Sequence, residues 1–567
     1  MAEQFLSAQT VTLKQYLSRD NGQYTIPFSQ RPYEWGEAQV NRLFKDLTAL
    51  GLSENSEDKH VLNFFTFSNE EGSLKLFDGQ QRTVTTLMIY AEGLKIAVER
   101  KELEPKFASK RYQNYISDED EDGNVTSKVV FDKKEVTDVF YSLLDLENKD
   151  IFEEYESSDS SIQTFIDNKK YIHELWMVFV AEHPGIKVKD VLTSFLDSSY
   201  LIQIVATTEE VAQKMFETLN NTGKSLEDYY VLKNDLVSSL GVENVREKWN
   251  KLDDLLGEIN RTSFLSTFAT LTKGKTSKSE LIDTLFNPDA EKEVHEQLLQ
   301  LLLSVADAYS KAVNPNQLDI IDKNDREKYA YLTEMLTDVF SLKQHIQILT
   351  AMIAKKYTDE DKIAVLTTIK NLAVKLLFFK EGRANQFESP LAELAHAIYT
   401  EELSVNDIQE ILSEGPLYVS DDSLRAIIVE REITTPSARK KAKFVFKELY
   451  DYEFENSQSE TRLPNILQQI HYEHILPEKP KEKSQWLKDF SDDTERRHLT
   501  NVLGNATLLI GLKNEKLGNK EFDVKREVYS TSFLPENKKL AVLTKWTPIE
   551  IKKRSNDLAE RFIQLYK

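Results

Sequence analysis

The amino-acid sequence predicts an α+β protein that is predominantly helical. The candidate strands are short segments that are rich in β-branched and aromatic residues and bounded by turn residues. They lie mainly in roughly the first ninety residues, in a stretch near residue 200 and in roughly the last hundred residues. Between about 245 and 450, apolar residues recur with helical spacing, and prolines and glycines are few. No fixed-period repeat is visible there, so we do not expect a solenoid.

The composition is that of a folded protein with several cores. The chain has 567 residues, 40% apolar and 10% aromatic, so we expect three or four domains of roughly 150 residues each. It contains no cysteine, which excludes disulfides, thiolate zinc sites and cysteine nucleophiles. The N-terminus lacks the pattern of a secretory signal, and no run approaches the ~18 apolar residues of a membrane helix. We therefore expect a cytoplasmic protein without a membrane partner.

The net charge is strongly negative. With 94 acidic and 72 basic side chains, the formal charge is −22, which argues against a protein that passively coats DNA. An enzyme with a local basic groove remains compatible with this charge. Two basic runs could supply such a groove, although such runs are usually solvated helix faces; they comprise Arg439, Lys440, Lys441, Lys443 and Lys447, and Lys552, Lys553 and Arg554.

In the first ninety or so residues, strands and helices alternate. Asp78 stands where a helix N-cap belongs, directly after an apolar strand. The expected elements are, in order, a strand over 24–28, a helix after Trp35 with Val40, Leu43, Phe44 and Leu47 on one face, strands over 61–67 and 74–77, and a helix over 80–92.

Further along, the acidic residues 117–124 are expected to form a solvated turn that joins two strands, because they lack the alternation of a calcium loop. A polar stretch over 455–461 marks a domain boundary. The remaining expected elements are a strand over 200–206, a helix through Ala212, Phe216 and Leu219, a C-terminal strand, loop and short hairpin, and a last helix opened by a capping box at Thr547-Pro-Ile-Glu550.

Near the C-terminal end, four short motifs carry residues suited to phosphodiester hydrolysis. Residues 470–477 (IHYEHILP) carry Glu473 and His474, and residues 503–510 (LGNATLLI) carry Asn505. Asn514 follows nine positions after Asn505, and Lys520, Phe522 and Lys525 come next. Such hydrolysis needs a base that takes a proton from water and a divalent ion that neutralises phosphate charge. A histidine at a strand end can be that base, and carboxylate and amide oxygens suit Mg²⁺ or Mn²⁺. A histidine with a purely structural role is the alternative for each position alone.

A second group of motifs lies near the N-terminus. Residues 26–35 (IPFSQRPYEW) and 77–87 (FDGQQRTVTTL) place Arg31, Asp78 and Arg82 around a strand-to-helix junction. A helix N-terminus together with arginines can bind phosphate, whereas a buried ion pair between Asp78 and an arginine is the structural alternative. Tyr33 and Trp35 could stack on a base, but packing of the first helix against the sheet is the preferred interpretation.

The segment Thr222-Gly-Lys-Ser225 is not predicted to be a phosphate-binding P-loop. The first glycine of that motif would fall at position 218, which is Thr218. The segment also follows a helix rather than a strand. Gly223 is instead expected to end that helix in a left-handed cap.

The C-terminal motifs resemble the ββα-metal (HNH) nuclease fold, and more closely the C-terminal HNH domain of GmrSD-type restriction proteins. The resemblance implies that His474 is the general base and that Glu473 and Asn514 bind the metal. Asn505 would brace the hairpin and orient the histidine. Asn519 and His471 are the alternative ligand and the alternative base.

The N-terminal motifs are similar to the ParB/sulfiredoxin-like N-terminal domain of the same family. The similarity continues over 216–226 and at Leu232-Lys233-Asn234. It implies a domain that binds and hydrolyses nucleoside triphosphates and regulates the nuclease. The residues assigned to nucleotide or phosphate contacts are Gln30, Arg31, Asp78, Gln80, Gln81 and Arg82.

The resemblance yields a three-part organisation and a function. Residues 1–240 would form the ParB/sulfiredoxin-like NTP-binding regulatory domain with a helical insertion, 241–455 a helical scaffold, and 456–567 the HNH nuclease domain with a C-terminal helix. We expect an NTP-regulated type IV restriction endonuclease, dependent on Mg²⁺ or Mn²⁺, that cleaves modified phage DNA. An HNH toxin acting on RNA or on DNA nonspecifically, and an inactive ParB-like nucleotide-switched clamp, are the alternatives. Homo-oligomerisation is left open.

Overall fold

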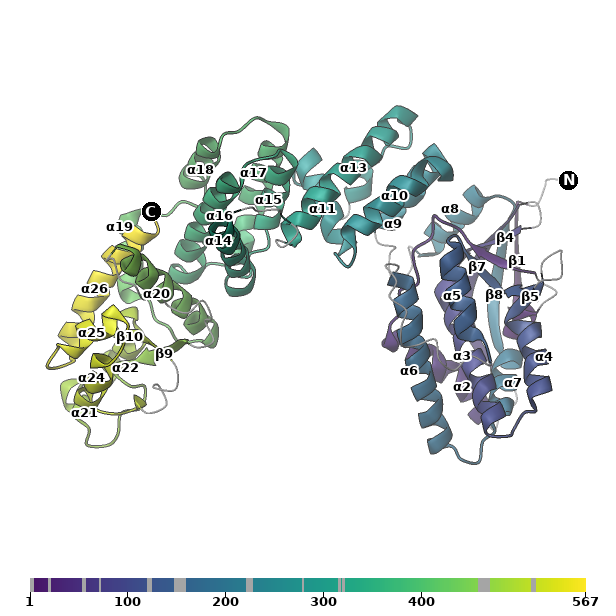
Figure 1. Cartoon of the computed structure of the whole chain (residues 1–567), viewed down its shortest axis with the longest axis horizontal. Coiled ribbons are helices and arrows are strands. Elements are labelled where there is room, and N and C mark those ends of the chain that lie inside the picture. The colour runs from purple at the N-terminus through teal and green to yellow at the C-terminus, as the bar shows by residue number, and fades with distance from the viewer. Residues whose placement is uncertain are drawn as a thin grey trace. The chain divides into compact units, whose positions relative to one another are not determined.

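The computed structural model describes residues 5–18, 22–53, 58–70, 73–119, 125–146, 160–220, 228–277, 280–314, 318, 322–456, 470–510 and 517–567. Contacts divide the chain into two compact units (Figure 1). Unit 1 comprises Met1–Leu265 and Phe286–Leu303, and unit 2 comprises Ser266–Leu285 and Ser304–Lys567. Each unit is described by itself.

Unit 1 contains a mixed six-stranded sheet. Its order is β1-β8-β3-β4-β2-β7. The pairs β1·β8 and β3·β4 are antiparallel, whereas β8·β3, β4·β2 and β2·β7 are parallel. The strands are β1 (Leu6–Thr12), β2 (Tyr24–Ile26), β3 (His60–Glu70), β4 (Ser73–Asp78), β7 (Val129–Phe131) and β8 (Ser199–Ala206). The strands expected over 24–28, 61–67, 74–77 and 200–206 are therefore confirmed.

Helices pack against this sheet and bury a large apolar core (Figure 1). The stripe expected after Trp35 is confirmed, since its four apolar residues are buried in α2. The helix bounds are α1 (Leu13–Leu17), α2 (Glu37–Leu52), α3 (Gln80–Glu99), α4 (Pro105–Tyr115), α5 (Lys134–Leu144), α6 (Ser160–Glu182), α7 (Val188–Ser198), α8 (Glu209–Asn220), α9 (Asp228–Leu240) and α10 (Val242–Leu256).

The structure bears on two local predictions in unit 1, the cap at Asp78 and the acidic segment that begins at residue 117. Asp78 is not the N-cap of α3, because Gly79 takes that position with a left-handed φ of 96°. A glycine tolerates this φ, and the Asp78 carboxylate accepts the Gly79 N–H instead (2.6 Å). The acidic segment begins as β5 (Ser117–Glu119), which pairs with β6 (Val125–Ser127); residues 120–124 lie outside the described residues.

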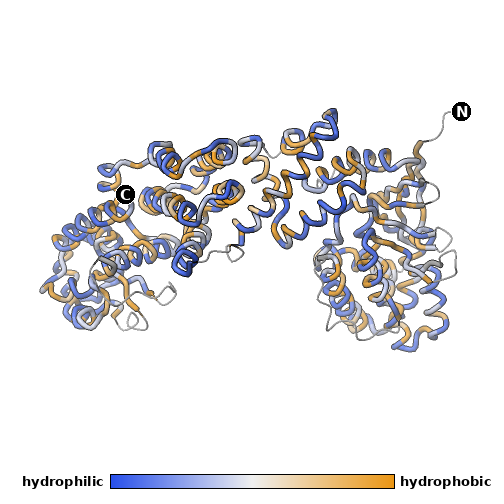
Figure 2. The backbone as a smooth tube through the Cα atoms, turned by 45° about the horizontal axis from the view of Figure 1, so that its top comes forward, coloured by the Kyte–Doolittle hydropathy of each residue, from blue (hydrophilic) through white to orange (hydrophobic). Residues whose placement is uncertain are grey.

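The region between about 245 and 450 is helical, as expected from its periodicity. Hydrophobic and hydrophilic residues alternate along these helices (Figure 2), and Thr358 and Ser404 open two of them with capping boxes. The helices are α11 (Arg261–Lys273), α12 (Leu281–Leu285), α13 (Lys292–Val313), α14 (Lys323–Glu334), α15 (His345–Ala354), α16 (Asp359–Ala373), α17 (Glu388–Thr400), α18 (Val405–Glu414), α19 (Asp421–Glu430) and α20 (Pro436–Asn456), with π-helical turns at Met335–Val339 and Val374–Phe379.

The C-terminal part of unit 2 is built around two antiparallel strands, β9 (Ile470–His474) and β10 (Ala506–Ile510), with His474 opposite Ala506. The hairpin is longer than the short one expected, because two helices lie between its strands. The capping box predicted at Thr547 opens the last helix. The other elements are α21 (Gln485–Asp489), α22 (Asp493–Asn501), a 3₁₀ turn (Leu503–Asn505), α24 (Phe522–Ser530), α25 (Pro535–Ala541) and α26 (Pro548–Leu565).

Among the residues that the structure describes, no helix is both long and apolar enough to cross a membrane.

Candidate nuclease and nucleotide sites

His474 is the last residue of β9, and its ring lies in a protected position. The ring makes an edge contact with Tyr472, with centroids 5.0 Å apart. Its Nε2 is buried, makes no hydrogen bond to any residue that the structure describes, and lies 3.7 Å from Oε1 of Glu478. Burial lowers the pKa of His474 to about 4, against the raising effect of Glu478. The imidazole is therefore neutral at neutral pH and carries a lone pair that can accept a proton.

Glu473 and His474 are consecutive in a strand, so their side chains point to opposite faces of the hairpin. Glu473 faces α24, where the fully buried Lys525 donates to its Oε1 (2.5 Å). Lys525 also donates to the backbone carbonyl of His474 (2.6 Å). Burial raises the pKa of Glu473 and lowers that of Lys525, because removal from water disfavours both charges. One ammonium group thus fixes both residues of the Glu-His pair.

Asn505 is completely buried and braces the chain just beyond His474. Its Nδ2 donates to the carbonyls of Leu476 and Thr500, both at 2.9 Å. Its Oδ1 accepts the N–H of Leu476 (2.7 Å) and the indole N–H of Trp546 (3.1 Å). All of its amide groups are therefore used in holding the segment that follows β9, and none is left for a substrate.

The remaining sequence-predicted nuclease residues are dispersed. Asn514 lies outside the described residues, so the structure does not place it. Asn519 is exposed and donates to the carbonyl of Lys479 (3.3 Å). His471 lies on the same strand face as Glu473, opposite Leu509. Within the described ranges, no three His, Asp or Glu side chains converge as a metal-binding group.

The last helix, α26, packs directly on the turn that carries Asn505. A Cβ on Gly504 would lie 2.6 Å from the carbonyl oxygen of Ile551, so only glycine permits this approach. Arg554 donates to the carbonyls of Gly504 (2.7 Å) and Ala506 (2.6 Å). The glycine of the 503–510 motif is thus explained by helix packing. Sequence reasoning missed this contact, because nothing local links residues fifty positions apart.

The same helix forms a buried ionic cluster with α25. Glu536 accepts a hydrogen bond from Arg561 (2.8 Å), and its other carboxylate oxygen lies 3.5 Å from Arg554. Burial opposes ionisation of Glu536, but Arg554 and Arg561 outweigh it and lower the pKa of the carboxyl to about 2. The cluster ties α25 and α26 together beneath β10.

Several of the basic side chains considered for a DNA groove have partners within the fold. Arg439 pairs with Glu478, and Lys440 donates to the carbonyl of Asp338 (2.7 Å). Lys447 is buried and pairs with Asp451 (2.5 Å). The run over 439–447 therefore makes contacts within the fold, rather than forming either a DNA groove or the purely solvated face given as the alternative.

In unit 1, Asp78 and Arg82 form an internal ion pair of 3.0 Å. Arg82 also donates to the carbonyls of Leu62 and Phe64 in β3, and its guanidinium lies 4.7 Å from the ring centroid of Phe65. These contacts match the structural alternative for this pair, and they turn the arginine away from a phosphate role.

The glutamines of the same motif fix the segment over 30–35. Gln81 donates to the carbonyl of Pro32 (2.9 Å) and accepts the N–H of Glu34 (3.0 Å). Gln80 donates to Oε1 of Gln30 (3.4 Å), whose Nε2 is buried without a partner in the described chain. Tyr33 is buried and bonded to Thr85 (2.8 Å), which confirms its packing role.

Gln30 and Arg31 line a small cleft of about 90 Å³ together with Phe28, Lys233 and Asp253. The Lys233 ammonium lies 4.0 Å from the centroid of the Phe28 ring. Burial lowers the pKa of Lys233 to about 8, although Asp253 favours the charged form. Phe28 and Lys233 belong to separate sequence motifs, and only the tertiary fold brings them close to Arg31.

Comparison with known protein families shows to which family the chain belongs. The family model described as GmrSD restriction endonuclease, N-terminal domain, matches residues 13–237, and the one described as GmrSD restriction endonucleases, C-terminal domain, matches residues 418–561. Together the matches span well over half of the chain. The chain belongs to the GmrSD restriction endonuclease family. A comparison with curated proteins finds no match.

Membership of the GmrSD family makes the chain a restriction endonuclease of the type IV kind, with DNA as its partner. The C-terminal GmrSD match begins before α19, so it takes in α19 and α20 as well as the hairpin. Both helices contact this part of the fold: α19 packs on α26, and α20 packs on β9 and β10.

Proposed function

We propose that the chain is an HNH-type, divalent-metal-dependent endonuclease that cleaves modified phage DNA under the control of a nucleoside triphosphate. The observation that carries the proposal is His474. It is a neutral, largely buried imidazole at the end of β9, and its Nε2 makes no hydrogen bond within the described residues, with Glu478 3.7 Å away and Glu473 preceding it on the strand. A hairpin followed by a helix, β9, β10 and α24, holds His474 on one face and Glu473, paired with Lys525, on the other.

The role proposed for His474 is to accept a proton from the attacking water. A base must be uncharged before it can do so, and burial keeps this imidazole uncharged. A pKa of about 4 makes it a weak base, but an anionic phosphate arriving beside the ring favours the protonated form and raises that pKa. Asn505 and Lys525 hold the backbone on either side of the histidine, so the ring keeps its position as the proton arrives.

The donor set is suited to Mg²⁺ or Mn²⁺. Such ions take one or two carboxylates, retain several waters and use phosphate oxygens, so they do not need three protein carboxylates. Glu473 and Asn514 would hold the ion. Bound there, it would neutralise charge on the scissile phosphate. Lys525 keeps the Glu473 carboxylate in place and lowers the cost of its charge.

The proposed position for a phosphate of the nucleotide is the cleft at Gln30 and Arg31, whose volume of about 90 Å³ is too small for the whole molecule. Arg31 is partly exposed, and its 3.9 Å ion pair with Glu34 is loose enough to be exchanged for a phosphate. The unpartnered Nε2 of Gln30 and the buried Lys233 supply two further donors. Gln81 supports the cleft wall through its bonds to Pro32 and Glu34. Asp78 and Arg82 bond to each other and, for Arg82, to carbonyls of β3, so we do not assign them a contact with the nucleotide.

The test is a digestion panel with the full chain. Modified phage DNA, unmodified plasmid and RNA are incubated with Mg²⁺, with and without nucleoside triphosphate. His474→Ala is compared with His471→Ala, a matched control on the same strand. We expect only His474→Ala to abolish cleavage and only modified DNA to be cut. Equal cutting of all substrates would favour a toxin, absence of cutting would favour a nucleotide-switched clamp, and full activity of His474→Ala would exclude the proposed base.

A further inference from the structure

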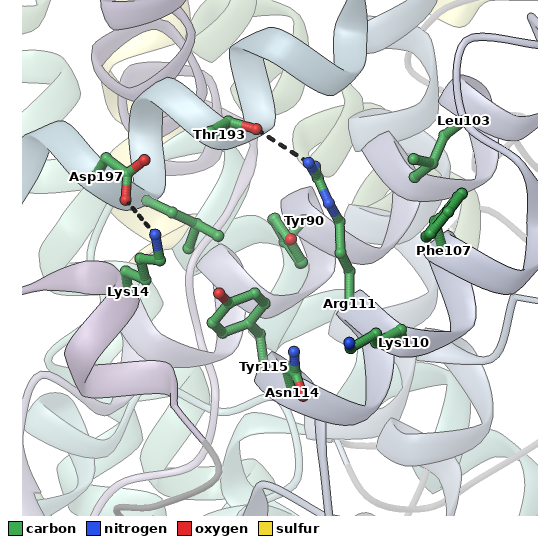
Figure 3. A pocket seen from close by; sticks show the side chains of 11 residues that line it. Lys14, Tyr90, Leu103, Phe107, Lys110, Arg111, Asn114, Tyr115, Thr193 and Asp197 are labelled. Carbon is green, nitrogen blue, oxygen red and sulfur yellow. Dashed lines mark hydrogen bonds and ion pairs between the residues drawn. The ribbon is translucent and has the colours of Figure 1, made fainter.

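A second hollow in unit 1 lies among α1, α3, α4 and α7. It has a volume of about 320 Å³, within the range of pockets that hold small ligands. Figure 3 shows its side chains converging from these helices. They are Lys14, Tyr90, Leu103, Phe107, Lys110, Arg111, Asn114, Tyr115, Thr193, Leu196 and Asp197.

The charge of this lining is opposite in sign to that of the chain. It carries three basic side chains and one acidic side chain. Lys14 pairs with Asp197 at 2.9 Å, whereas Lys110 has no ion pair among the described residues. Arg111 donates to the carbonyl of Lys189 (3.3 Å) and to the hydroxyl of Thr193 (3.2 Å), both long bonds that leave further guanidinium donors. Two cations are thus available to an anion.

Aromatic rings stand beside these cations. The rings of Tyr90 and Tyr115 meet edge to face, with centroids 5.8 Å apart. The Tyr90 hydroxyl is buried beside the Arg111 guanidinium and makes no hydrogen bond of standard geometry in the described structure. Burial raises the pKa of Tyr90, so its hydroxyl keeps its proton and can donate. Phe107 is half-exposed and offers a face on which a flat ring can stack.

This hollow is separate from the cleft at Gln30. Tyr90 lies ten residues after Gln80 in α3, which places it about 15 Å further along the helix axis. No sequence motif pointed to this region, because its residues come from four helices.

We propose that the hollow binds a nucleoside phosphate. Arg111 and Lys110 contact the phosphate, since a guanidinium can pair with two phosphate oxygens at once. Phe107 or Tyr115 stacks on the base. The side-chain amide of Asn114, which has both donor and acceptor atoms, forms hydrogen bonds with the edge of the base. The ligand is either a free nucleotide or an unpaired nucleotide of a DNA strand, because both present the same chemistry.

Photo-crosslinking to the full chain tests this proposal. The probes are a 4-thiothymidine oligonucleotide and 8-azido-ATP, used in EDTA so that cleavage does not interfere. We expect adducts within residues 103–115 with at least one probe. An adduct from the oligonucleotide identifies a strand site, and one from 8-azido-ATP identifies a nucleotide site. Adducts only elsewhere, including the cleft at Gln30, would overturn the proposal while leaving the proposed function intact.

Affinity measurements give a second test. The double variant Lys110→Gln/Arg111→Gln should weaken binding of the crosslinking probe about tenfold or more and flatten its salt dependence. Phe107→Ala removes only a half-exposed ring and should weaken the same probe about fivefold, at unchanged melting temperature. Lys170→Gln, at an exposed lysine of α6 outside the hollow, is the matched control. Unchanged affinities in both test variants would also refute the site.

Discussion

Removal of the Lys525 ammonium should destabilise the C-terminal fold strongly. In Lys525→Met, the carboxylate of Glu473, which is 5% exposed, loses its partner, and the carbonyl of His474 loses a donor. Breaking a buried pair from one side costs about 3–5 kcal/mol. Because burial already raises the pKa of Glu473, protonation limits this cost. We therefore expect a loss of about 3 kcal/mol at neutral pH.

A double-mutant cycle separates charge from packing. Glu473→Gln in the Lys525→Met background removes the stranded charge, so the double variant should regain more than 1 kcal/mol. The measurement is urea unfolding of the full chain, followed by hydrogen exchange of peptides from β9 and α24. A loss below about 0.5 kcal/mol in Lys525→Met, or no recovery in the double variant, would refute the role assigned to this lysine.

Three further predictions concern the packing around the two sites. Gly504→Ala should destabilise the C-terminal region by about 1–3 kcal/mol, read as a lower melting temperature, because a Cβ collides with α26. Gly79→Ala should cost a similar amount in unit 1, because φ is 96° and a Cβ meets the Phe65 ring; an unchanged melting temperature would contradict this. Glu536 has a folded pKa of about 2, below its usual 4.5, so its contribution is present above pH 4.5 and lost as pH falls towards 2. Glu536→Gln should lack that acid-dependent loss in pH-dependent unfolding.

The strands and helices around the sites could be predicted, because their patterns are local. The strand over 61–67 and the stripe on α2 depend on spacing that a short window reveals. His474 was likewise expected at a strand end from its neighbours alone. Even the glycine at 79 was visible as part of a motif, although the N-cap was expected one residue earlier, at Asp78.

The functions of individual polar residues could not be predicted in the same way. Arg82 was predicted to contact phosphate, but three of its N–H donors bond to Asp78 and to the carbonyls of Leu62 and Phe64 in β3. Lys525 stood at the end of the C-terminal motifs, but nothing in the sequence indicated its partners, which lie about fifty positions earlier in the chain. A motif shows which residues occur together in the sequence. The fold determines which of their hydrogen-bonding groups remain available to bind a ligand.

The close packing of α26 on the Asn505 turn has a consequence for how the protein is made. Domains generally fold in the order of their synthesis. The hairpin that carries His474 needs Arg554 and the helix around it, which leave the ribosome after the sheet of unit 1 is complete. A nascent chain therefore acquires its N-terminal unit first, and the hairpin that carries His474 is completed only once α26 has been released.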